Sequence, residues 1–292
     1  MENCNLCPHR CNVDRVNKLG ICKAYDKVKI ALSSLHFYEE PCISGEKGSG
    51  TVFFSHCNLN CVYCQNYEIS QENKGKEISI YDLANIFMEQ QEKNANNINL
   101  VSPTPYVPFI IDALKIAKRK GLKIPIIYNS SGYENIETLK LLEGYIDVYL
   151  PDFKYSDNNL AVKYSKAPNY VEVVQNAMKE MYRQVGSPIL DENGIIKKGL
   201  IIRHLVLPGE IENSKSVLKW IEQNIDNSVY VSVMAQYFPT YKAKLIDKIN
   251  RKLTKEEYEA IENFLYSLNL ENGYIQELGE HEEEYVPNFN IK

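Results

Sequence analysis

The sequence predicts an α/β protein in which six strands alternate with helices and form one parallel sheet. Short apolar runs of strand length alternate along the chain with longer segments whose apolar residues recur at helical spacing. The 292 residues, 44% of them hydrophobic, are ample for one large core, and the chain has no internal repeat. Six strand–helix units are fewer than the eight of a complete β/α barrel.

The six expected strands are short apolar runs, and all but the last are followed directly by polar, glycine or proline residues. Because chemistry gathers at the strand ends of parallel barrels, the polar residues there are candidate site residues. A further short strand is expected at 28–32, ahead of a turn at 45–50 that lacks the Gly-Lys-Ser/Thr of a P-loop. The six strands are 51–54, 98–101, 124–128, 147–150, 200–207 and 229–233.

Helices are expected between these strands, where apolar residues recur every three or four positions. Ser79 with Asp82, and Thr254 with Glu257, form capping-box patterns, so a helix should begin at each of these two points. The helix before the third strand is expected to end at Gly121. The apolar helix faces lie within 83–87, 107–117, 139–142, 173–181, 217–225 and 258–268.

Residues 1–27 are a cysteine-rich segment, and residues 28–292 hold the α/β domain with an acidic C-terminal extension. The segment has too few apolar residues for a core of its own, so bound metal would supply its folding free energy. Four thiolates close either a tetrahedral zinc site or a complete auxiliary iron–sulfur cluster, and without metal the segment would be a flexible leader. His9 is expected at the surface, since four cysteines suffice as ligands. The cysteines, spaced C-x2-C-x3-C-x10-C, are Cys4, Cys7, Cys11 and Cys22.

A second group of cysteines follows the strand at 51–54. Cys57, Cys61 and Cys64 are spaced C-x3-C-x2-C. Four thiolates would close a four-iron cluster for electron transfer, whereas three leave one iron free to bind another ligand. The alternatives are buried structural thiols or part of a zinc site. Cys42 has no spacing partner and is expected to be buried, although its position ahead of the strand makes it a possible fourth ligand.

These residues resemble the radical SAM superfamily, whose enzymes bind S-adenosylmethionine (SAM) at the open iron of a [4Fe-4S] cluster. The resemblance is closest to the branch of pyruvate formate-lyase activating enzymes and covers about residues 28–290. The N-terminal cysteines favour uncharacterised relatives in that branch over the activating enzymes themselves. The resemblance implies an open, TIM-like partial barrel of six strand–helix units. The most specific matching stretches are 57–66, 129–132, 152–154 and 203–209.

The resemblance further implies which residues of the first two strand ends meet SAM. Tyr63 would lie near the adenine, and Asn66 belongs to the same motif. After the second strand the superfamily usually has Gly-Gly-Glu, which binds the amino group of SAM. This chain has Ser-Pro-Thr there, so the hydroxyl and carbonyl oxygens of Ser102 and Thr104 would accept the ammonium instead.

Later strand ends supply the remaining candidates. Asn129 and Ser130 would meet the SAM carboxylate or ribose. Asp152 would help to bind a cation beside SAM, and its alternative roles are a helix cap or an ion pair with the lysine two residues on. Arg203 would point either at the SAM carboxylate or at a neighbouring acid. His204 must face the opposite side of the strand, because side chains alternate, and we expect Arg203 to face the interior.

The implied function is reductive cleavage of SAM to methionine and a 5′-deoxyadenosyl radical, which abstracts hydrogen from a substrate. That substrate is either a glycine of a partner protein, as for the activating enzymes, or a small molecule. A flavodoxin- or ferredoxin-type reductant is the implied electron donor. The rival functions are an iron–sulfur electron-transfer or metal-binding protein without SAM chemistry, and a zinc-stabilised structural protein.

Composition and charge argue against several other classes. The net charge of −5 and the pI near 5.7 make nucleic acid an unexpected partner. No run of 18 apolar residues exists, so no membrane span is expected. The N-terminus has no basic region followed by an apolar one, so we expect no signal peptide. Eight cysteines in such a chain indicate metal binding in a reducing cytoplasm rather than disulfides.

Overall fold

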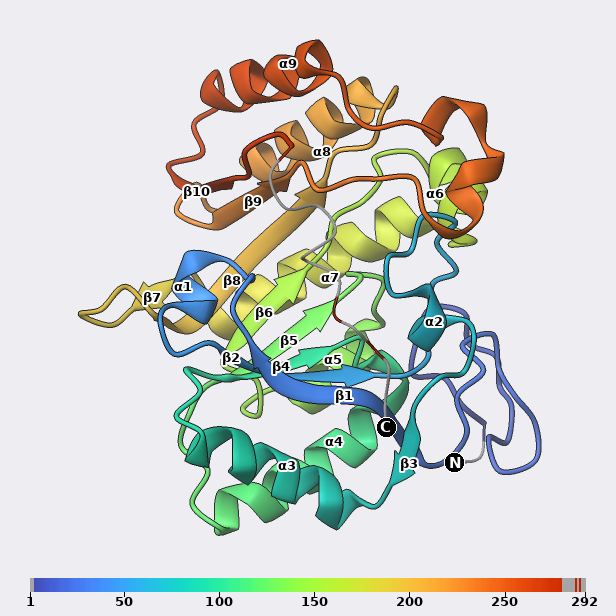
Figure 1. Cartoon of the computed structure of the whole chain (residues 1–292), viewed down its shortest axis with the longest axis vertical. Helices are drawn as coiled ribbons and strands as arrows, with labels where there is room; N and C mark the ends of the chain where they lie inside the picture. Colours follow the sequence, from blue (N-terminus) through green and yellow to red (C-terminus); the bar gives the residue numbers. More distant parts are fainter. Residues whose placement is uncertain (1–2, 280–286, 288, 290–292) are drawn as a thin grey trace.

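The computed structural model describes residues 3–279, 287 and 289, and these residues form an α/β fold on one ten-stranded sheet that does not close (Figure 1). The strand order is β10-β9-β8-β6-β5-β4-β2-β1-β3, with β7 paired to β8 off this path. The six predicted strands are confirmed, and they lie side by side in chain order with parallel pairing throughout. They are β2 (Ser49–Phe54), β4 (Ile98–Val101), β5 (Ile126–Ser130), β6 (Val148–Pro151), β8 (Ile196–Leu205) and β9 (Tyr230–Met234).

The edges of the sheet extend beyond the prediction. β1 (Val28–His36) is longer than the expected short strand and pairs antiparallel with β2. β3 (Lys76–Ile78) pairs antiparallel with β1, and β10 (Asn272–Ile275) pairs parallel with β9. β7 (Ile189–Leu190) has two residues and pairs antiparallel with β8. Such short edge strands depend on a distant partner for their hydrogen bonds and therefore carry little local signal.

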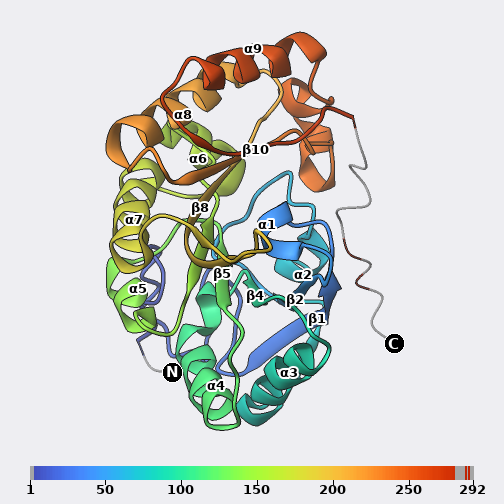
Figure 2. The same cartoon turned by 90° about the vertical axis from the view of Figure 1, so that its left-hand side faces the viewer.

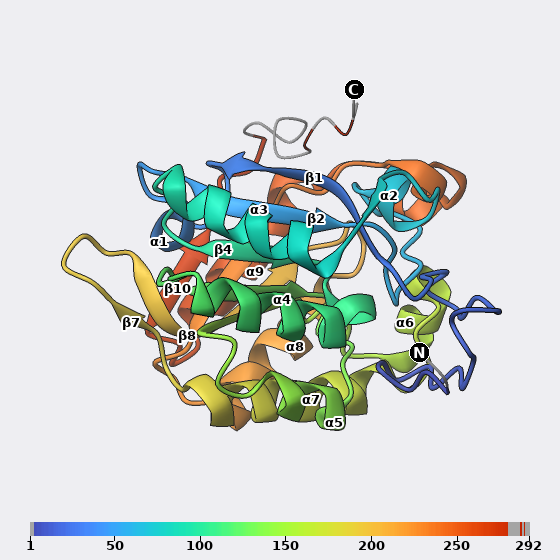
Figure 3. The same ribbon diagram turned by 90° about the horizontal axis from the view of Figure 1, so that it is seen from below.

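The predicted helices are present, and Figures 2 and 3 show α3, α4, α5, α7 and α8 along the outer face of the sheet. Both capping boxes are confirmed, at Ser79 with Asp82 and at Thr254 with Glu257. No helix in the described part of the chain is long and apolar enough to span a membrane. The helices are α3 (Ile80–Glu92), α4 (Val107–Arg119), α5 (Ile136–Leu142), α7 (Tyr170–Val185), α8 (Ile211–Asn224) and α9 (Lys255–Tyr266).

Three short α-helices were not predicted, because four to eight residues are too few to show a helical period. α1 (Pro41–Ser44) precedes β2, α2 (Tyr67–Ser70) follows the second group of cysteines, and α6 (Asn158–Ser165) follows β6. Short 3-10 turns are also present, at Thr104–Tyr106, Tyr241–Leu245 and Asp247–Ile249.

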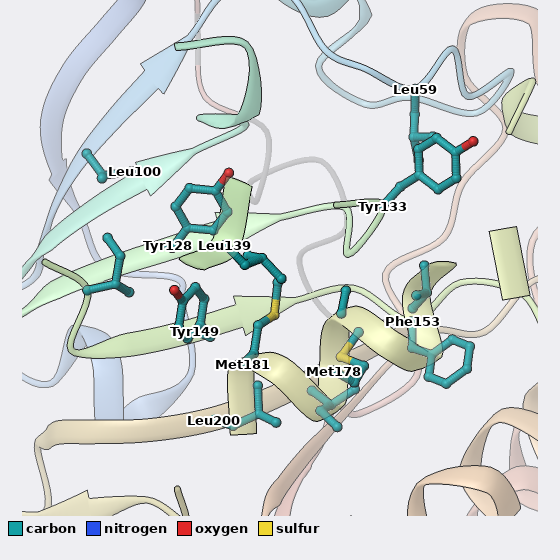
Figure 4. Close-up of a cluster of buried hydrophobic side chains, with 14 of the residues drawn as sticks. Leu59, Leu100, Tyr128, Tyr133, Leu139, Tyr149, Phe153, Met178, Met181 and Leu200 are labelled. Atoms are coloured by element: carbon teal, nitrogen blue, oxygen red, sulfur yellow. The ribbon is translucent and has the colours of Figure 1, made fainter. Parts of the chain in front are cut away.

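Two apolar clusters cover the two faces of the sheet, because successive residues of a strand point to opposite sides. Tyr128 of β5 belongs to the larger cluster, between the sheet and the outer helices, together with Met178 of α7 (Figure 4). The preceding residue, Ile127, belongs to a smaller cluster with Cys42 of α1. Cys42 is buried, as predicted. Helix α1 therefore fills the interior near the amino ends of the strands, and the carboxyl ends remain available for a site.

The N-terminal segment that precedes β1 has neither helix nor strand from residue 3 onward and packs against the rest of the fold. The buried side chain of Arg15 donates hydrogen bonds to the carbonyl oxygens of Ala24 and Tyr25 within the segment and to that of Pro105 outside it. His9 was expected at the surface, and the structure places it half-buried. Its Nε2 lies 2.8 Å from the carbonyl oxygen of Asn58, and its ring packs edge-on against Tyr133. The segment is therefore joined directly to the loop that carries the second group of cysteines.

Candidate active site

A cavity of about 540 Å³ lies at the carboxyl ends of the parallel strands. Cys57, Cys61 and Cys64 line it, and no other cysteine of the described residues does so. The loops after β4, β5 and β6 also contribute to its wall, as do residues of β8 and β9. The fold thus brings the predicted cysteine loop and the polar strand ends into one space, as expected for a parallel barrel.

Backbone hydrogen bonds hold the cysteine loop in place. The strand β2 ends at Phe54, and His56 then takes a left-handed conformation, with φ of 71°, that turns the chain into the loop. The amide of Asn60 donates to the carbonyl of Ser165 at 3.0 Å, and the amide of Val62 donates to that of Tyr164 at 2.8 Å. Both acceptors belong to α6, so this unpredicted helix fixes the loop on either side of Cys61.

Each thiol of the loop has its own hydrogen-bonding partner. Cys57 Sγ accepts from the amide of Leu59 at 3.4 Å. Ser165 Oγ donates to Cys61 Sγ at 3.0 Å, and Ser70 Oγ lies 3.3 Å from Cys64 Sγ. Burial raises the pKa of the Cys61 thiol to about 11 and that of the other two thiols above their usual range. Without a bound cation these side chains are therefore neutral thiols near pH 7, and a metal must displace their protons.

The three thiols fit a cluster better than they fit a single ion. No group of three histidine, cysteine or acidic side chains among the described residues is arranged to hold one metal ion. A four-iron cluster does not require such convergence, because each thiolate binds a different iron. The hydrogen bonds to Cys57 and Cys61 are also of the kind that stabilises thiolate ligands of iron–sulfur clusters. The donor set therefore fits three irons of a cubane.

Asp152 and Lys154 form an ion pair in the wall of the cavity. Lys154 Nζ lies 2.5 Å from Asp152 Oδ2, and both side chains line the cavity. Burial by itself disfavours the ammonium, but the negative charge of Asp152 and its hydrogen bond to Lys154 outweigh it and raise the pKa of Lys154. The ion pair was the alternative interpretation of Asp152, and the structure places it within the cavity rather than at the protein surface. Lys154 was not predicted as a site residue in its own right.

Most of the other candidate residues also line the cavity. Tyr63 and Asn66 do so from the cysteine loop, and Ser102, Asn129 and Ser130 do so from the ends of β4 and β5. The main chain bends sharply after β4, because Ser102 has a left-handed conformation with a φ of 58°. These five residues, all expected around SAM, therefore line the same cavity as the three thiols.

Thr104 is an exception among the predicted residues. It is buried and does not line the cavity. Its hydroxyl donates to Glu134 Oε1 at 2.6 Å, so it is already committed to a partner inside the protein. Burial raises the pKa of Glu134 to about 8, although hydrogen bonds from Thr104 and Ser130 oppose this shift. The prediction that the Thr104 hydroxyl accepts the SAM ammonium is thus corrected, because the 3-10 turn that starts there directs this side chain inward.

Arg203 lines the cavity but is bound to acids. It donates from Nε to Glu40 Oε1 at 2.8 Å and also contacts Glu39. Of its two predicted roles, the pairing with a neighbouring acid is the one the structure shows. His204 faces the other side, where its ring nitrogens lie 2.6 Å from the carbonyl of Phe153 and 2.8 Å from Ser214 Oγ. The expected alternation of Arg203 and His204 is therefore present.

Comparison with known proteins decides the family. The family model of the radical SAM superfamily matches residues 51–221, which is more than half of the chain. The chain belongs to the radical SAM superfamily. It is 34% identical over 92% of its length to the uncharacterized protein MJ0674 of Methanocaldococcus jannaschii, covering 76% of that protein. It is 22% identical over 80% of its length to the pyruvate formate-lyase-activating enzyme of Clostridium pasteurianum, covering 93% of that enzyme.

Two solved structures show the same fold as this radical SAM protein. The native anSMEcpe with bound AdoMet superposes with a TM-score of 0.54 at 15% identity, over 81% of this chain and 62% of that one. Streptococcus suis SuiB bound to the precursor peptide SuiA gives a TM-score of 0.52 at 16% identity, over 78% of this chain and 48% of that one. The chain thus spans less than two thirds of the length of either protein.

The four N-terminal cysteines of this radical SAM protein lie apart from the cavity lining, in the segment packed beside the cysteine loop. They are close enough to influence one another, since neighbouring thiols contribute to the raised pKa of both Cys7 and Cys22, after the larger effect of burial. The amide of Ile21 donates to Cys11 Sγ at 3.3 Å. The structure thus gathers the four cysteines, but no three of them form a ready site for one ion.

Sequence reasoning missed three groups of side chains at this site. The sequence could have indicated Lys154, because it stands two positions after Asp152 and residues two apart on an extended segment share a face. The pair Glu39 and Glu40 lies in a loop with no periodic pattern. Ser70 and Ser165 contact thiols from short helices that were not predicted. Only the first of these could have been found without the tertiary structure.

Proposed function

We propose that Cys57, Cys61 and Cys64 bind three irons of a [4Fe-4S] cluster and that SAM binds at the fourth iron. The observation that carries the proposal is the shared cavity, which these three thiols line together with polar residues from several strand ends. When bound, such a cluster supplies one electron to the SAM sulfonium, and the carbon–sulfur bond breaks to give methionine and a 5′-deoxyadenosyl radical.

The polar residues of the cavity would hold SAM in one orientation. Lys154 offers a buried ammonium to the SAM carboxylate, while Asp152 keeps that ammonium charged or shares a cation beside it. Ser102, Asn129 and Ser130 offer hydroxyl, amide and carbonyl groups to the amino group and ribose. Tyr63 and Asn66 would lie beside the adenine.

Arg203 is proposed to act on SAM only indirectly. Its guanidinium already pairs with Glu39 and Glu40, and together the three groups carry one net negative charge. This charge faces the cavity and favours a cationic ligand group, such as the sulfonium or ammonium of SAM. Arg203 would thereby hold the two carboxylates in position instead of contacting the SAM carboxylate itself.

For the substrate, we propose a polypeptide that presents a hydrogen to the cavity, as a glycine of a partner protein does for an activating enzyme. The similarity to the pyruvate formate-lyase-activating enzyme of Clostridium pasteurianum supports this choice. The peptides named with SuiB and with anSMEcpe also support it. A small molecule is the alternative substrate class. A flavodoxin- or ferredoxin-type protein is the proposed electron donor.

The test uses the full chain, reconstituted anaerobically with iron and sulfide, then reduced and given SAM. We expect about four irons per chain at the loop site, a changed EPR spectrum on SAM binding and slow release of 5′-deoxyadenosine. An electron carrier without SAM chemistry would hold the cluster but leave SAM intact. A zinc-stabilised structural protein would take up no iron at all, and either outcome would reject the proposal.

The N-terminal cysteines are proposed to form a second, closed metal site, whose metal orders the segment 1–27. Their grouping in a segment without a core of its own supports this proposal. Changing Cys4, Cys7, Cys11 and Cys22 together to alanine should remove one zinc or about four irons from the purified protein. Metal analysis distinguishes the two metals, and an unchanged metal content would show that the segment is ordered by packing alone.

A further inference from the structure

A chain of buried hydroxyl groups ends on one of the loop thiols. Ser165 Oγ donates to Cys61 Sγ at 3.0 Å. The hydroxyl of Tyr155 lies 2.6 Å from Ser165 Oγ, and the hydroxyl of Tyr63 lies 2.5 Å from that of Tyr155. All three side chains are at least 95% buried, so water does not compete for these hydrogen bonds.

The direction of every hydrogen bond in this series of hydroxyl groups follows from the one to Cys61. A thiolate that binds iron has no proton and can only accept. Ser165 has a single hydroxyl proton, and donating it to Cys61 obliges its oxygen to accept from Tyr155. Tyr155 then accepts from Tyr63 in the same way. The three hydroxyls therefore point their protons toward one sulfur, and each bond polarises the next.

The backbone keeps this donor against its sulfur. Ser165 is the last residue of α6, and the next residue, Lys166, is left-handed with φ of 56° and ends the helix. The carbonyls of Tyr164 and Ser165 accept the amides of Val62 and Asn60, which flank Cys61 on both sides. Movement of the cysteine loop would therefore carry Ser165 with it.

We propose that Ser165 is a positioning residue that raises the reduction potential of the cluster through its hydrogen bond to the Cys61 sulfur, with Tyr155 and Tyr63 reinforcing it. This inference rests on the proposed cluster. One electron from the external reductant adds negative charge that is shared with the thiolate sulfurs. A donor at one sulfur stabilises the reduced form more than the oxidised form. No proton is transferred and no bond is broken in this step.

The test is the midpoint potential of the reconstituted full chain, measured by EPR during titration with dithionite and mediators in the absence of SAM. Ser165→Ala should lower the equilibrium constant for reduction about fivefold, which is about 40 mV for a one-electron couple. Ser165→Thr keeps the hydroxyl, so its midpoint potential should equal that of the parent. Iron is counted in each sample, so that only fully loaded protein is compared.

Two further variants separate this effect from a loss of packing. Tyr155→Phe keeps the ring and the Ser165 donor, and should shift the midpoint in the same direction by a smaller amount. Ser214→Ala removes another fully buried hydroxyl, one that lies 2.8 Å from His204 and touches no thiol, and should leave the midpoint unchanged. If Ser165→Ala cannot be loaded with iron, Tyr155→Phe still provides the comparison.

The outcomes distinguish this inference from the proposed function. Parent protein that takes up no four-iron cluster would reject the proposed function itself. A loaded parent whose midpoint is matched by both Ser165→Ala and Tyr155→Phe would overturn the role of Ser165 alone. An equal shift in Ser214→Ala would also overturn it, because the effect would then come from general loosening of the fold.

Discussion

Arg203 donates from Nε and Nη2 to the two carboxylate oxygens of Glu40, a residue 163 positions earlier in the chain. The pair joins β8 to the loop before α1. The neighbouring Glu39 forms a second ion pair with the same guanidinium. Burial opposes ionisation of Glu40, but the charge of Arg203 outweighs it and lowers the pKa of that carboxyl. One side of the cavity is therefore made of a charged, nearly buried cluster in place of apolar side chains.

Removing the cation from this cluster should destabilise the protein. Arg203→Met leaves the carboxylates of Glu39 and Glu40 without their cationic partner, and we expect a loss of about 3–5 kcal/mol in the free energy of unfolding at pH 7. The parent's stabilisation is present above the ordinary glutamate pKa and is lost as pH falls through the lowered pKa of Glu40. Urea unfolding curves of parent and variant should thus converge as pH falls below about 4.5.

Arg183→Met is the matched control for that measurement. Arg183 also pairs with two glutamates, Glu143 and Glu180, but its side chain is 51% exposed. Its loss should cost no more than about 1 kcal/mol, since exposed pairs are screened by water. Equal losses in the two arginine variants would contradict the view that the Arg203 cluster is a buried structural element of the cavity.

The three loop cysteines should be required for SAM chemistry, and Cys42 should not. Alanine at Cys57, Cys61 or Cys64 should abolish the EPR response to SAM and the release of 5′-deoxyadenosine. Cys42→Ala should keep both, because Cys42 packs beside Ile127 and does not line the cavity. Cys42→Ala should lower the free energy of unfolding by about 1 kcal/mol. A Cys42→Ala protein that gains a SAM response absent from the parent would make Cys42 a fourth ligand.

Asp152 is predicted to support SAM binding more than folding. Asp152→Asn keeps the shape of the side chain but removes the charge that holds Lys154, and SAM affinity should fall about tenfold, as measured by equilibrium dialysis of the reconstituted protein. The melting temperature should change little. Asp112→Asn serves as control, since Asp112 forms an exposed pair with Lys115 on α4. Normal SAM affinity in Asp152→Asn, with a clearly lower melting temperature, would make Asp152 structural.

Glu134 should make stability depend on pH. Its pKa is raised by burial to about 8, so between the ordinary value near 4.3 and about 8 the folded state binds more protons than the unfolded chain. Stability must then fall as pH rises through this window. Glu134→Gln cannot ionise, and relative to the parent it should gain about 1–3 kcal/mol between pH 5 and pH 8.

The exposed Glu137, on α5, provides the control for Glu134. Glu137→Gln should keep the pH profile of the parent over the same range, because its side chain is 73% exposed and has no buried proton to lose. Chemical unfolding at several pH values gives all three curves. Parallel curves for Glu134→Gln and the parent would mean that Glu134 is ionised in the folded protein throughout this range.

The order of the strands and helices could be predicted because each signal is contained within a few residues. The apolar run 98–101 is confirmed as β4, and the Ser79–Asp82 capping pattern does begin α3. The spacing of Cys57, Cys61 and Cys64 pointed to the radical SAM superfamily for the same reason. Parallel pairing then follows from the alternation of strands and helices, and it places the strand ends together.

What the tertiary structure decided are the contacts between residues far apart in the chain, since such pairs leave no local pattern. Arg203 meets Glu40 and Ser165 meets Cys61 across 163 and 104 positions. Thr104 turns inward to Glu134 although its neighbour Ser102 lines the cavity. The sequence alone therefore determined the fold class and the cysteine loop. The burial and hydrogen bonding that set the charge of each side chain in the cavity depend on packing, and only the folded chain defines them.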